Sequence, residues 1–286
     1  MKTLGIITNS KRDKDFVFTR QMVDWLRERG VSLAFDGGYT DVRDVTHIEP
    51  MALSGLLALV ALGGDGTILQ TSQLAAPHNL PILGINTGTI GYITDVESAE
   101  AYTALERTLA GDYELERRIM LEASLKVNAP THTCRDANTS PVLALNDIYA
   151  ARALPNQMIE IEVRVNSVFI ACFRCDGILV ATPTGSTAYN LSAGGPLIKP
   201  EIDAIVITPI CPHSLSHRPL VISGNDRVSL RLISQSEKNG VLIADGQAVS
   251  SIGHNDTVNI CRSRHFTSLI KTAALSFYDR LRIKIR

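Results

Sequence analysis

The chain has 286 residues, of which 45% are hydrophobic, and a formal net charge of -1 at pH 7. This length and composition allow a large buried core and one or two domains, and we expect two. The near-neutral balance, without a long run of one charge sign, disfavours a nucleic-acid partner. No apolar run approaches the ~20 residues that span a bilayer, and the N-terminus lacks a secretory pattern, so we expect a cytoplasmic protein with no membrane partner.

Cysteine and histidine spacing predicts neither a disulfide framework nor a zinc site. The five cysteines form no paired pattern, and an odd number in a chain of this length indicates reduced thiols. Cys172 and Cys175 form a C-x-x-C, but a strand-like segment points them to opposite faces, and no second pair supplies further ligands. His213 and His217 flank a Pro-rich turn. A zinc hydrolase is therefore disfavoured.

The N-terminal part of the chain alternates between short apolar strands and helices. We predict strands at 4–8, 31–35, 57–62 and 81–85, and helices at 16–29, from 67 onward, and at 97–109. This alternation implies a parallel sheet covered by helices. Ligands bind such sheets at the carboxyl ends of the strands, where we also expect segment 86–92.

From residue 113 onward, the pattern changes to alternating strands. These are expected at 121–127, 159–165, 168–173, 178–181, 204–208, 228–233, 241–244 and 258–261. Together they predict a mostly antiparallel β-sandwich. The polar segment 128–141 is expected to be a surface loop carrying Cys134. Residues 269–281 have helical spacing and predict a C-terminal helix that packs against another part of the fold.

The strand at 57–62 leads into a turn of three glycines and one aspartate, Gly63-Gly64-Asp65-Gly66. Glycines allow a ligand to approach closely, and a helix beginning near Thr67 directs free N–H groups at the turn, which predicts a phosphate cradle. A carboxylate repels phosphate there. Asp65 is therefore expected to take a proton from an attacking hydroxyl or to help hold a divalent cation. The alternative is a plain glycine turn in which Asp65 caps the helix.

A second block, at residues 176–196, begins with a buried strand and continues as a glycine- and threonine-rich segment from Thr182. Its turn at 182–187 leads into a short helix, which Ser186 or Thr187 is expected to cap and Gly194-Gly195 to end. The four hydroxyls, the free N–H groups and a tyrosine suit the sugar and base of a nucleotide. The alternative is an unusually polar structural turn.

A third element, Asn146-Asp147, sets an amide beside a carboxylate at a strand end. The pair can bind two ribose hydroxyls or an adenine edge, although Asn-Asp is also ordinary turn chemistry. The chain lacks a G-x-x-x-x-G-K-[ST] loop and an H-R-D loop, which excludes the P-loop and protein-kinase routes. We expect a metal cation in place of the missing lysine, with no ligands assigned.

In this order, these motifs resemble the bacterial NAD kinase family over nearly the whole chain, together with segments 212–221 and 245–247. The turn at 63–67 is only moderately specific, since diacylglycerol-kinase-like and phosphofructokinase-like enzymes share it. The block at 182–189 is highly specific. The resemblance implies an α/β N-terminal domain at 1–118, rejoined by a C-terminal helix within 266–286, and a β-sandwich NAD-binding domain at 119–265.

The resemblance also implies an enzyme, a phosphotransferase that moves the γ-phosphate of ATP to the 2'-hydroxyl of the adenosine ribose of NAD, giving NADP and ADP. It implies a divalent cation, Mg²⁺ or Mn²⁺, and a homodimer or homotetramer. By similarity, Asp65 is the proton acceptor. The residues expected to bind the dinucleotide are Gly66, Asn146, Asp147, Arg174, Asp176, Thr187, Ala188, Tyr189, Asn190, Leu191, Ser192 and Gln247. The family often has Glu where Asp147 stands, one methylene longer.

Two other functions remain open on the residues: a lipid kinase that shares the turn at 63–67, and a non-catalytic dinucleotide sensor. The polar block at 182–192 and the lack of an amphipathic membrane face disfavour the lipid kinase. Asp65 is a poor residue for mere phosphate binding, which disfavours the sensor. The motifs are compatible with NAD or NADH as acceptor, and with ATP or polyphosphate as donor.

Overall fold

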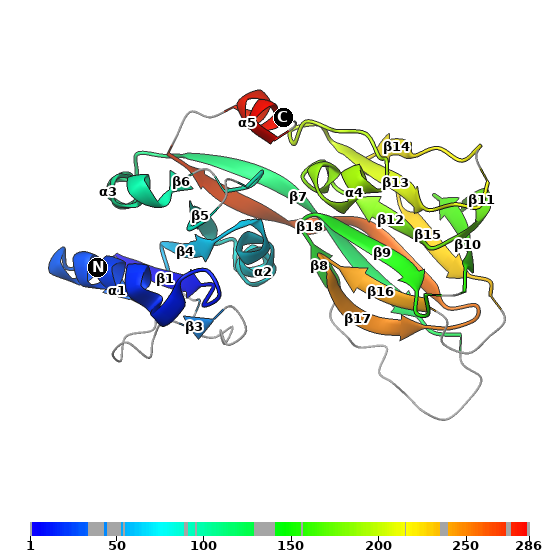
Figure 1. Cartoon of the computed structure of the whole chain (residues 1–286), viewed down its shortest axis with the longest axis horizontal. Coiled ribbons are helices and arrows are strands. Elements are labelled where there is room, and N and C mark those ends of the chain that lie inside the picture. The colour runs from blue at the N-terminus through cyan, green and yellow to red at the C-terminus, as the bar shows by residue number, and fades with distance from the viewer. Residues whose placement is uncertain are drawn as a thin grey trace. The chain divides into compact units, whose positions relative to one another are not determined.

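The computed structural model describes residues 2–33, 43–44, 53, 55–88, 91–94, 96–128, 141–155, 157–214, 216–234, 240–272 and 276–284 (Figure 1). Several predicted features lie partly outside these residues: the end of the strand at 31–35, residues 89–90 of segment 86–92, most of the loop at 128–141 with Cys134, residue 215 of segment 212–221, and residues 273–275 of the helix at 269–281. The chain divides into two compact units. The first is Met1–Arg118 with His265–Arg286, and the second is Ile119–Arg264.

The first unit contains a mostly parallel sheet. Its central strands β1 (Thr3–Thr8), β4 (Ala58–Gly63) and β5 (Pro81–Asn86) pair in the order β5-β4-β1. The short strands β2 (Ser32–Leu33) and β3 (Arg43–Asp44) pair with β1, and β6 (Val96–Glu97) pairs with β5. Every residue of β4 is buried, as expected for a parallel strand packed on both faces. The predicted α/β fold of this part is confirmed.

Three helices pack with this sheet: α1 (Val17–Glu28), α2 (Asp65–Ala75) and α3 (Ala101–Ala110) (Figure 1). Short 3-10 helices adjoin them at Lys14–Phe16, Ala76–His78 and Ser98–Glu100. Met22 and Leu26 of α1 share a buried core with Leu62 of β4. Gly111 takes a left-handed conformation (φ 80°) and ends α3 one residue beyond the predicted end at 109.

The predicted helix at 269–281 is wrong in its first part. Leu269 and Ile270 are buried residues of β18 (Thr257–Lys271), and the helix α5 spans only Phe277–Lys284. Ser268 and Leu269 pair in parallel with the start of β5. The strand forms here because pairing with β5 satisfies the backbone and places both apolar side chains in the core. Helical spacing alone does not report such a distant partner.

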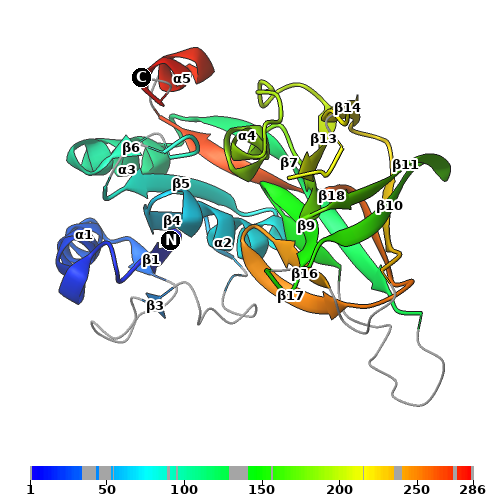
Figure 2. The ribbon, with the colours of Figure 1, turned by 45° about the vertical axis from the view of Figure 1, so that its right-hand side comes forward.

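The second unit is a sandwich of two largely antiparallel sheets (Figure 2). One sheet has the order β11-β10-β15-β18, with β7 paired to β18 and β8 to β7, and the other has the order β14-β13-β12-β9-β16-β17. The strands are β7 (Glu114–Lys126), β8 (Val142–Ala144), β9 (Asp147–Arg152), β10 (Ile159–Val165), β11 (Val168–Cys175), β12 (Gly177–Ala181), β13 (Ala204–Ile210), β14 (Leu220–Ser223), β15 (Val228–Leu232), β16 (Gly240–Ala244) and β17 (Gln247–Ile252).

Apolar side chains from both sheets fill the sandwich core, among them Ile161 and Leu230 from one sheet and Ile178 from the other. The strands β12 and β13 are buried along their whole length. Their second face is covered by a smaller cluster that includes Ile198 of the segment following α4 (Tyr189–Ser192). The predicted β-sandwich is confirmed, and the strands that sequence patterning did not indicate are β8, β9, β14 and β17.

Candidate functional site

The glycine turn of the first unit connects β4 directly to α2. The helix begins at Asp65, two residues before the predicted start, and Gly64 is its N-cap. Asp65 does not cap the helix through its side chain, which contradicts the capping alternative. Gly66 is exposed in the first turn of α2. The free N–H groups of this helix end therefore follow a turn without bulky side chains, as anion binding requires.

The Asp65 carboxylate is held by the segment 91–94. Its Oδ2 accepts the backbone N–H of Tyr92 at 2.7 Å, and its Oδ1 accepts those of Ile93 at 3.1 Å and Thr94 at 3.3 Å. A Cβ at Gly91 would collide with Oδ1, so only glycine permits this close approach. Three amides in a row therefore orient the carboxylate.

Arg12 is a basic residue beside the turn that sequence reasoning missed. Its guanidinium occupies the space that a Cβ at Gly88 would take, and its Nη2 lies 3.9 Å from the Cβ position of Gly64. The side chain is exposed. A cation here can neutralise phosphate charge at the turn. The available signal was a basic residue shortly after the carboxyl end of β1, the edge where ligands of parallel sheets bind.

In the second unit, Asn146 and Asp147 lie at the start of β9 and are anchored by Asp245. The Asp245 carboxylate accepts the backbone N–H groups of Leu145 and Asn146, each at 2.8 Å, and of Asp147 at 3.2 Å. Asn146 is only 7% exposed, and its Oδ1 finds no hydrogen-bond partner within the described part of the chain. A buried acceptor of this kind is unusual and calls for a donor from a ligand.

The Asp147 side chain is also buried, with 4% of its surface exposed. Burial, and then the nearby charge of Asp245, raise the pKa of Asp147 to about 7. Tyr149 and Tyr189 stack edge to face at 5.3 Å between ring centroids. Burial raises the pKa of Tyr189, and the charges of Cys211, Asp176 and Asp147 add to the shift. These groups therefore lie within electrostatic reach of one another.

The block at 182–192 folds as a 3-10 helix (Gly185–Thr187) followed by α4. Three of its hydroxyls donate hydrogen bonds to backbone carbonyl oxygens of the protein itself. Thr182 Oγ1 donates to Leu145 O at 2.6 Å. Ser186 Oγ donates to Pro183 O at 2.6 Å, and Thr187 Oγ1 donates to Thr184 O at 3.1 Å. The prediction that these hydroxyls face a nucleotide is wrong for Thr182 and Ser186, which are fully buried. The predicted capping of α4 by Ser186 or Thr187 is also wrong. The helix has no side-chain cap, and both hydroxyls donate to the backbone carbonyl three residues earlier.

Asn190 is a structural member of this block. Its Oδ1 accepts from Thr208 Oγ1 at 2.7 Å, and its Nδ2 donates to Ser186 O at 3.3 Å and Pro196 O at 3.0 Å. The side chain is fully buried, so it holds the segment to β13. Tyr189, Leu191 and Ser192 are exposed, whereas Thr187 and Ala188 are half-buried.

The remaining predicted residues lie at two other places of the second unit. Arg174 is exposed near the end of β11. Asp176 follows that strand, and its Oδ2 lies 3.1 Å from Nη2 of Arg152, a partner that sequence reasoning missed. Gln247 is exposed at the start of β17 and pairs with Ala244 across the turn that contains Asp245. Gln247 therefore lies in the same hairpin that anchors Asn146 and Asp147.

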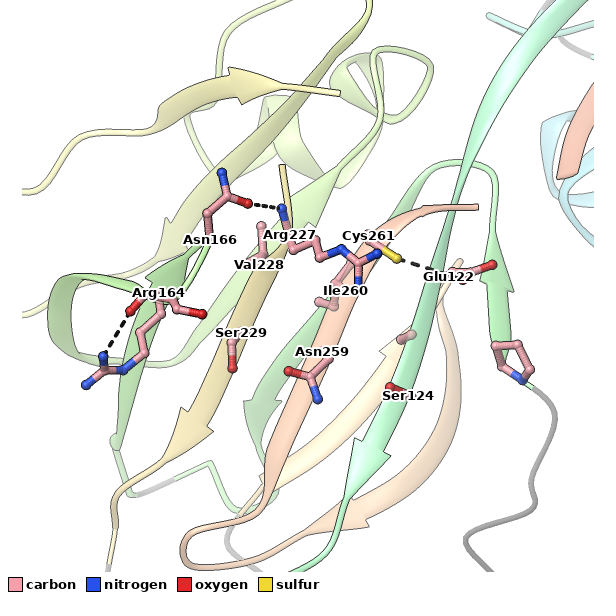
Figure 3. A pocket seen from close by; sticks show the side chains of 13 residues that line it. Glu122, Ser124, Arg164, Asn166, Arg227, Val228, Ser229, Asn259, Ile260 and Cys261 are labelled. Carbon is pink, nitrogen blue, oxygen red and sulfur yellow. Dashed lines mark hydrogen bonds between the residues drawn. The ribbon is translucent and has the colours of Figure 1, made fainter. Parts of the chain in front are cut away.

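The second unit also has a hollow of about 440 Å³ that contains none of the predicted residues (Figure 3). It lies over β7, β10, β15 and β18, and its lining includes Arg164, Arg227 and Asn259. Across the described ranges, no group of three or more His, Cys, Asp or Glu side chains is arranged to hold a metal. Cys172 is exposed and Cys175 buried, which confirms that they face opposite sides of β11.

The chain is a phosphotransferase, and its glycine turn lacks a P-loop lysine. Residues 4–113 match the ATP-NAD kinase N-terminal domain, and residues 145–272 match the ATP-NAD kinase C-terminal domain. The chain belongs to the ATP-NAD kinase family, and its activity is the ATP-dependent phosphorylation of NAD. The lipid-kinase and sensor alternatives are thereby set aside.

Similar proteins span the whole chain. It is 38% identical to the NAD kinases of Caldanaerobacter subterraneus subsp. tengcongensis and Heliobacterium modesticaldum, covering 100% of this chain and 99% of each relative. A solved NAD kinase from Archaeoglobus fulgidus in complex with ATP is similar with a TM-score of 0.75 and 26% identity, covering 99% and 97% of the two chains. Yeast NADH kinase complexed with NADH shares the fold, with a TM-score of 0.82 at 23% identity over 100% and 87%. No helix in the described segments is long and apolar enough to cross a membrane.

Proposed function

We propose that the second unit holds the acceptor NAD and that Asp65 accepts the proton of the 2'-hydroxyl during transfer of the γ-phosphate of ATP. The buried and unpaired Oδ1 of Asn146 carries this proposal. Leaving such an acceptor unpaired costs roughly 1–3 kcal/mol, which a ligand N–H or O–H can recover. The adenine amino group and the ribose hydroxyls of NAD are donors of this kind.

The other dinucleotide contacts follow from exposure and proximity. Asp147 and Gln247 flank Asn146 through the Asp245 hairpin, and Tyr189 lies within electrostatic reach of Asp147. The proposed binding residues are Gly66, Asn146, Asp147, Arg174, Asp176, Thr187, Ala188, Tyr189, Leu191, Ser192 and Gln247. Asn190 supports them by fixing α4 to β13.

Asp65 suits the role of proton acceptor because its orientation is fixed. A carboxylate offers about four lone-pair sites, and three of those of Asp65 take backbone N–H groups, which leaves room for one more donor. As the 2'-oxygen bonds to the γ-phosphorus, the bond from that phosphorus to the β,γ-bridging oxygen breaks. The hydroxyl proton passes to Asp65, and ADP leaves.

We propose that the divalent cation arrives as the Mg²⁺ or Mn²⁺ complex of ATP. The described carboxylates fit this better than a protein cage, since no three of them converge and those of Asp65 and Asp245 are occupied by backbone amides. Such a cation keeps most of its contacts to phosphate and water and neutralises phosphate charge. Arg12 is placed to add a second positive charge at the turn.

We also propose a cytoplasmic homodimer or homotetramer. The edge strand β11 exposes Val168, Phe169 and Ile170 by 63%, 52% and 41%. Natural proteins rarely leave an apolar edge strand open to water. Light scattering after size exclusion tests this, and a monomer at micromolar concentration contradicts it.

Calorimetry with NAD alone tests the binding assignment. Asn146→Ala should weaken NAD binding by roughly 1–3 kcal/mol, because the ligand donor loses its buried acceptor. Asn259→Ala is the matched control, since it changes an exposed asparagine of the same unit with no proposed role. Unchanged NAD affinity in the Asn146 variant rules out the assignment.

A further inference from the structure

Arg280 of α5 is a buried arginine whose position requires an explanation. Only 5% of its surface is exposed, and burying a guanidinium is costly unless it is well paired. The nearby Glu116 already binds Nη2 of Arg118 at 2.5 Å and Nζ of Lys271 at 2.9 Å. Glu116 also favours the protonated form of Arg280, and burial, followed by the charge of Arg280, lowers the pKa of Lys271 to about 6.

The Arg280 side chain reaches the segment that orients Asp65. Its Nη1 donates to the carbonyl oxygen of Tyr92 at 2.9 Å. The N–H of the same residue, Tyr92, makes the shortest of the three hydrogen bonds to Asp65. A second α5 side chain, Lys284, places its Nζ 5.5 Å from the centre of the Tyr92 ring. The helix thus contacts Tyr92 at two points.

Arg280 and Asp65 also interact electrostatically. Burial lowers the pKa of Arg280, and the negative charges of Glu116 and then Asp65 oppose that shift. The guanidinium therefore lies close enough to Asp65 to interact with its charge. Burial raises the pKa of Tyr92, and Asp65 raises it further, which places the same carboxylate beside the same residue.

We propose that Arg280 is a positioning residue for phosphoryl transfer: it fixes the Tyr92 carbonyl and thereby the three amides that orient Asp65. This inference rests on the proposed role of Asp65 as proton acceptor. Without Arg280, segment 91–94 loses its hydrogen bond to α5, and the Asp65 carboxylate is held less firmly in one orientation. A displacement of about 1 Å at a reacting group can lower turnover by roughly 100-fold.

The first experiment measures kcat and both KM values in the full-length chain. Arg280→Gln and Arg280→Met should lower kcat by roughly 10- to 100-fold while KM for NAD and ATP is unchanged. Arg280→Lys should recover part of the loss, since an ammonium group can still donate to the Tyr92 carbonyl. Arg282→Gln is the control, because Arg282 lies on the same helix with a side chain 73% exposed. Melting temperatures show which variants are folded. If Arg280→Gln is unstable, Arg280→Met replaces it in the test, because methionine keeps the apolar part of the arginine side chain.

A double-mutant cycle with Asp65→Asn separates positioning from mere stability. If Arg280 acts through Asp65, adding Arg280→Gln or Arg280→Met to Asp65→Asn should lower kcat little further. Full additivity, or parental kcat in a folded Arg280 variant, overturns the inference. If Asp65→Asn alone keeps its turnover, the proposed base fails, and the inference that depends on it fails for that separate reason.

Discussion

Asp147 and Asp245 exchange backbone-directed hydrogen bonds at one end of β9. Asp245 Oδ1 accepts the N–H of Asp147 at 3.2 Å, and the N–H of Asp245 donates to the Asp147 carbonyl at 2.9 Å. The Asp245 carboxylate is held by three amides, whereas the Asp147 carboxyl is buried beside that charge. Burial, and then the neighbouring charge of Asp245, raise the pKa of Asp147 to about 7.

The raised pKa predicts how stability changes with pH. Between pH ~4, near the usual Asp value, and pH ~7, the folded protein holds a proton on Asp147 that the unfolded chain has lost. Asp147 therefore makes stability fall as pH rises, by up to about 1.4 kcal/mol per pH unit, and the effect levels off above the folded pKa. Asp147→Asn should remove this fall. The melting temperature of the variant minus that of the parent should therefore increase from pH 5 to pH 7.

The control for this prediction is Asp203→Asn, a change at a half-exposed carboxylate that pairs with Arg262. Its melting temperature should change in parallel with the parent between pH 5 and 7. A parallel course for Asp147→Asn as well would show that Asp147 is ionised throughout this range.

Arg12 predicts a selective effect on the phosphoryl donor. Arg12→Gln removes the guanidinium next to Gly64 and Gly88, so KM for ATP should rise by roughly 10-fold, as expected for the loss of a hydrogen bond to a charged group. The affinity for NAD measured by calorimetry should stay unchanged. Lys11→Gln serves as the control, since Lys11 is the exposed neighbour. Equal KM values for ATP in the two variants would contradict a phosphate role for Arg12.

Local patterns were sufficient to predict the elements that serve the glycine turn. The apolar run at 57–62 is long enough to indicate a strand buried on both faces, and β4 is buried throughout. A cluster of glycines indicates a turn independently of the residues that pack around it. The start of α2 was placed two residues late, because an aspartate in the first turn was not distinguished from one in the loop.

Contacts between distant residues could not be predicted in the same way. Asp65 meets Tyr92 across 27 positions, and Asp245 meets Asn146 across 99. The buried hydroxyl of Ser186 is another case, since its bond to Ile198 depends on how the chain returns after α4. A polar residue in a glycine-rich block can serve a ligand or its own backbone, and only the folded chain decides which.

The C-terminal segment should stabilise the first unit. Truncation after Arg264 removes the strand end that pairs with β5 and also α5, so it should lower solubility and the melting temperature by exposing apolar surface. Leu269→Ala is a milder test: Leu269 is 3% exposed, and the change should cost roughly 2–5 kcal/mol. Ile283→Ala, at a side chain 46% exposed on α5, should cost far less. A truncated chain with the parental melting temperature would refute the assignment.

Asp65→Asn is the sharpest test of the chemistry, because it removes the charge and preserves the shape. The amide oxygen of Asn can still accept from Ile93 and Thr94, whereas its NH2 cannot accept from Tyr92, so segment 91–94 should keep two of its three hydrogen bonds. Without repulsion between carboxylate and phosphate, nucleotide binding should stay the same or tighten slightly. The 2'-hydroxyl then lacks its proton acceptor, and positioned general bases contribute roughly 100- to 10,000-fold.

Turnover of Asp65→Asn should therefore fall by at least about 100-fold, while calorimetry shows NAD affinity little changed. A role for Asp65 in holding the cation predicts a different result, because raising Mg²⁺ or Mn²⁺ would then restore part of the activity. Retention of more than about a tenth of the parental turnover would contradict the base assignment, since the smallest expected contribution of a general base is roughly 100-fold. Asp112→Asn, at an exposed carboxylate of the same unit, should leave turnover at the parental value and controls for the loss of one negative charge.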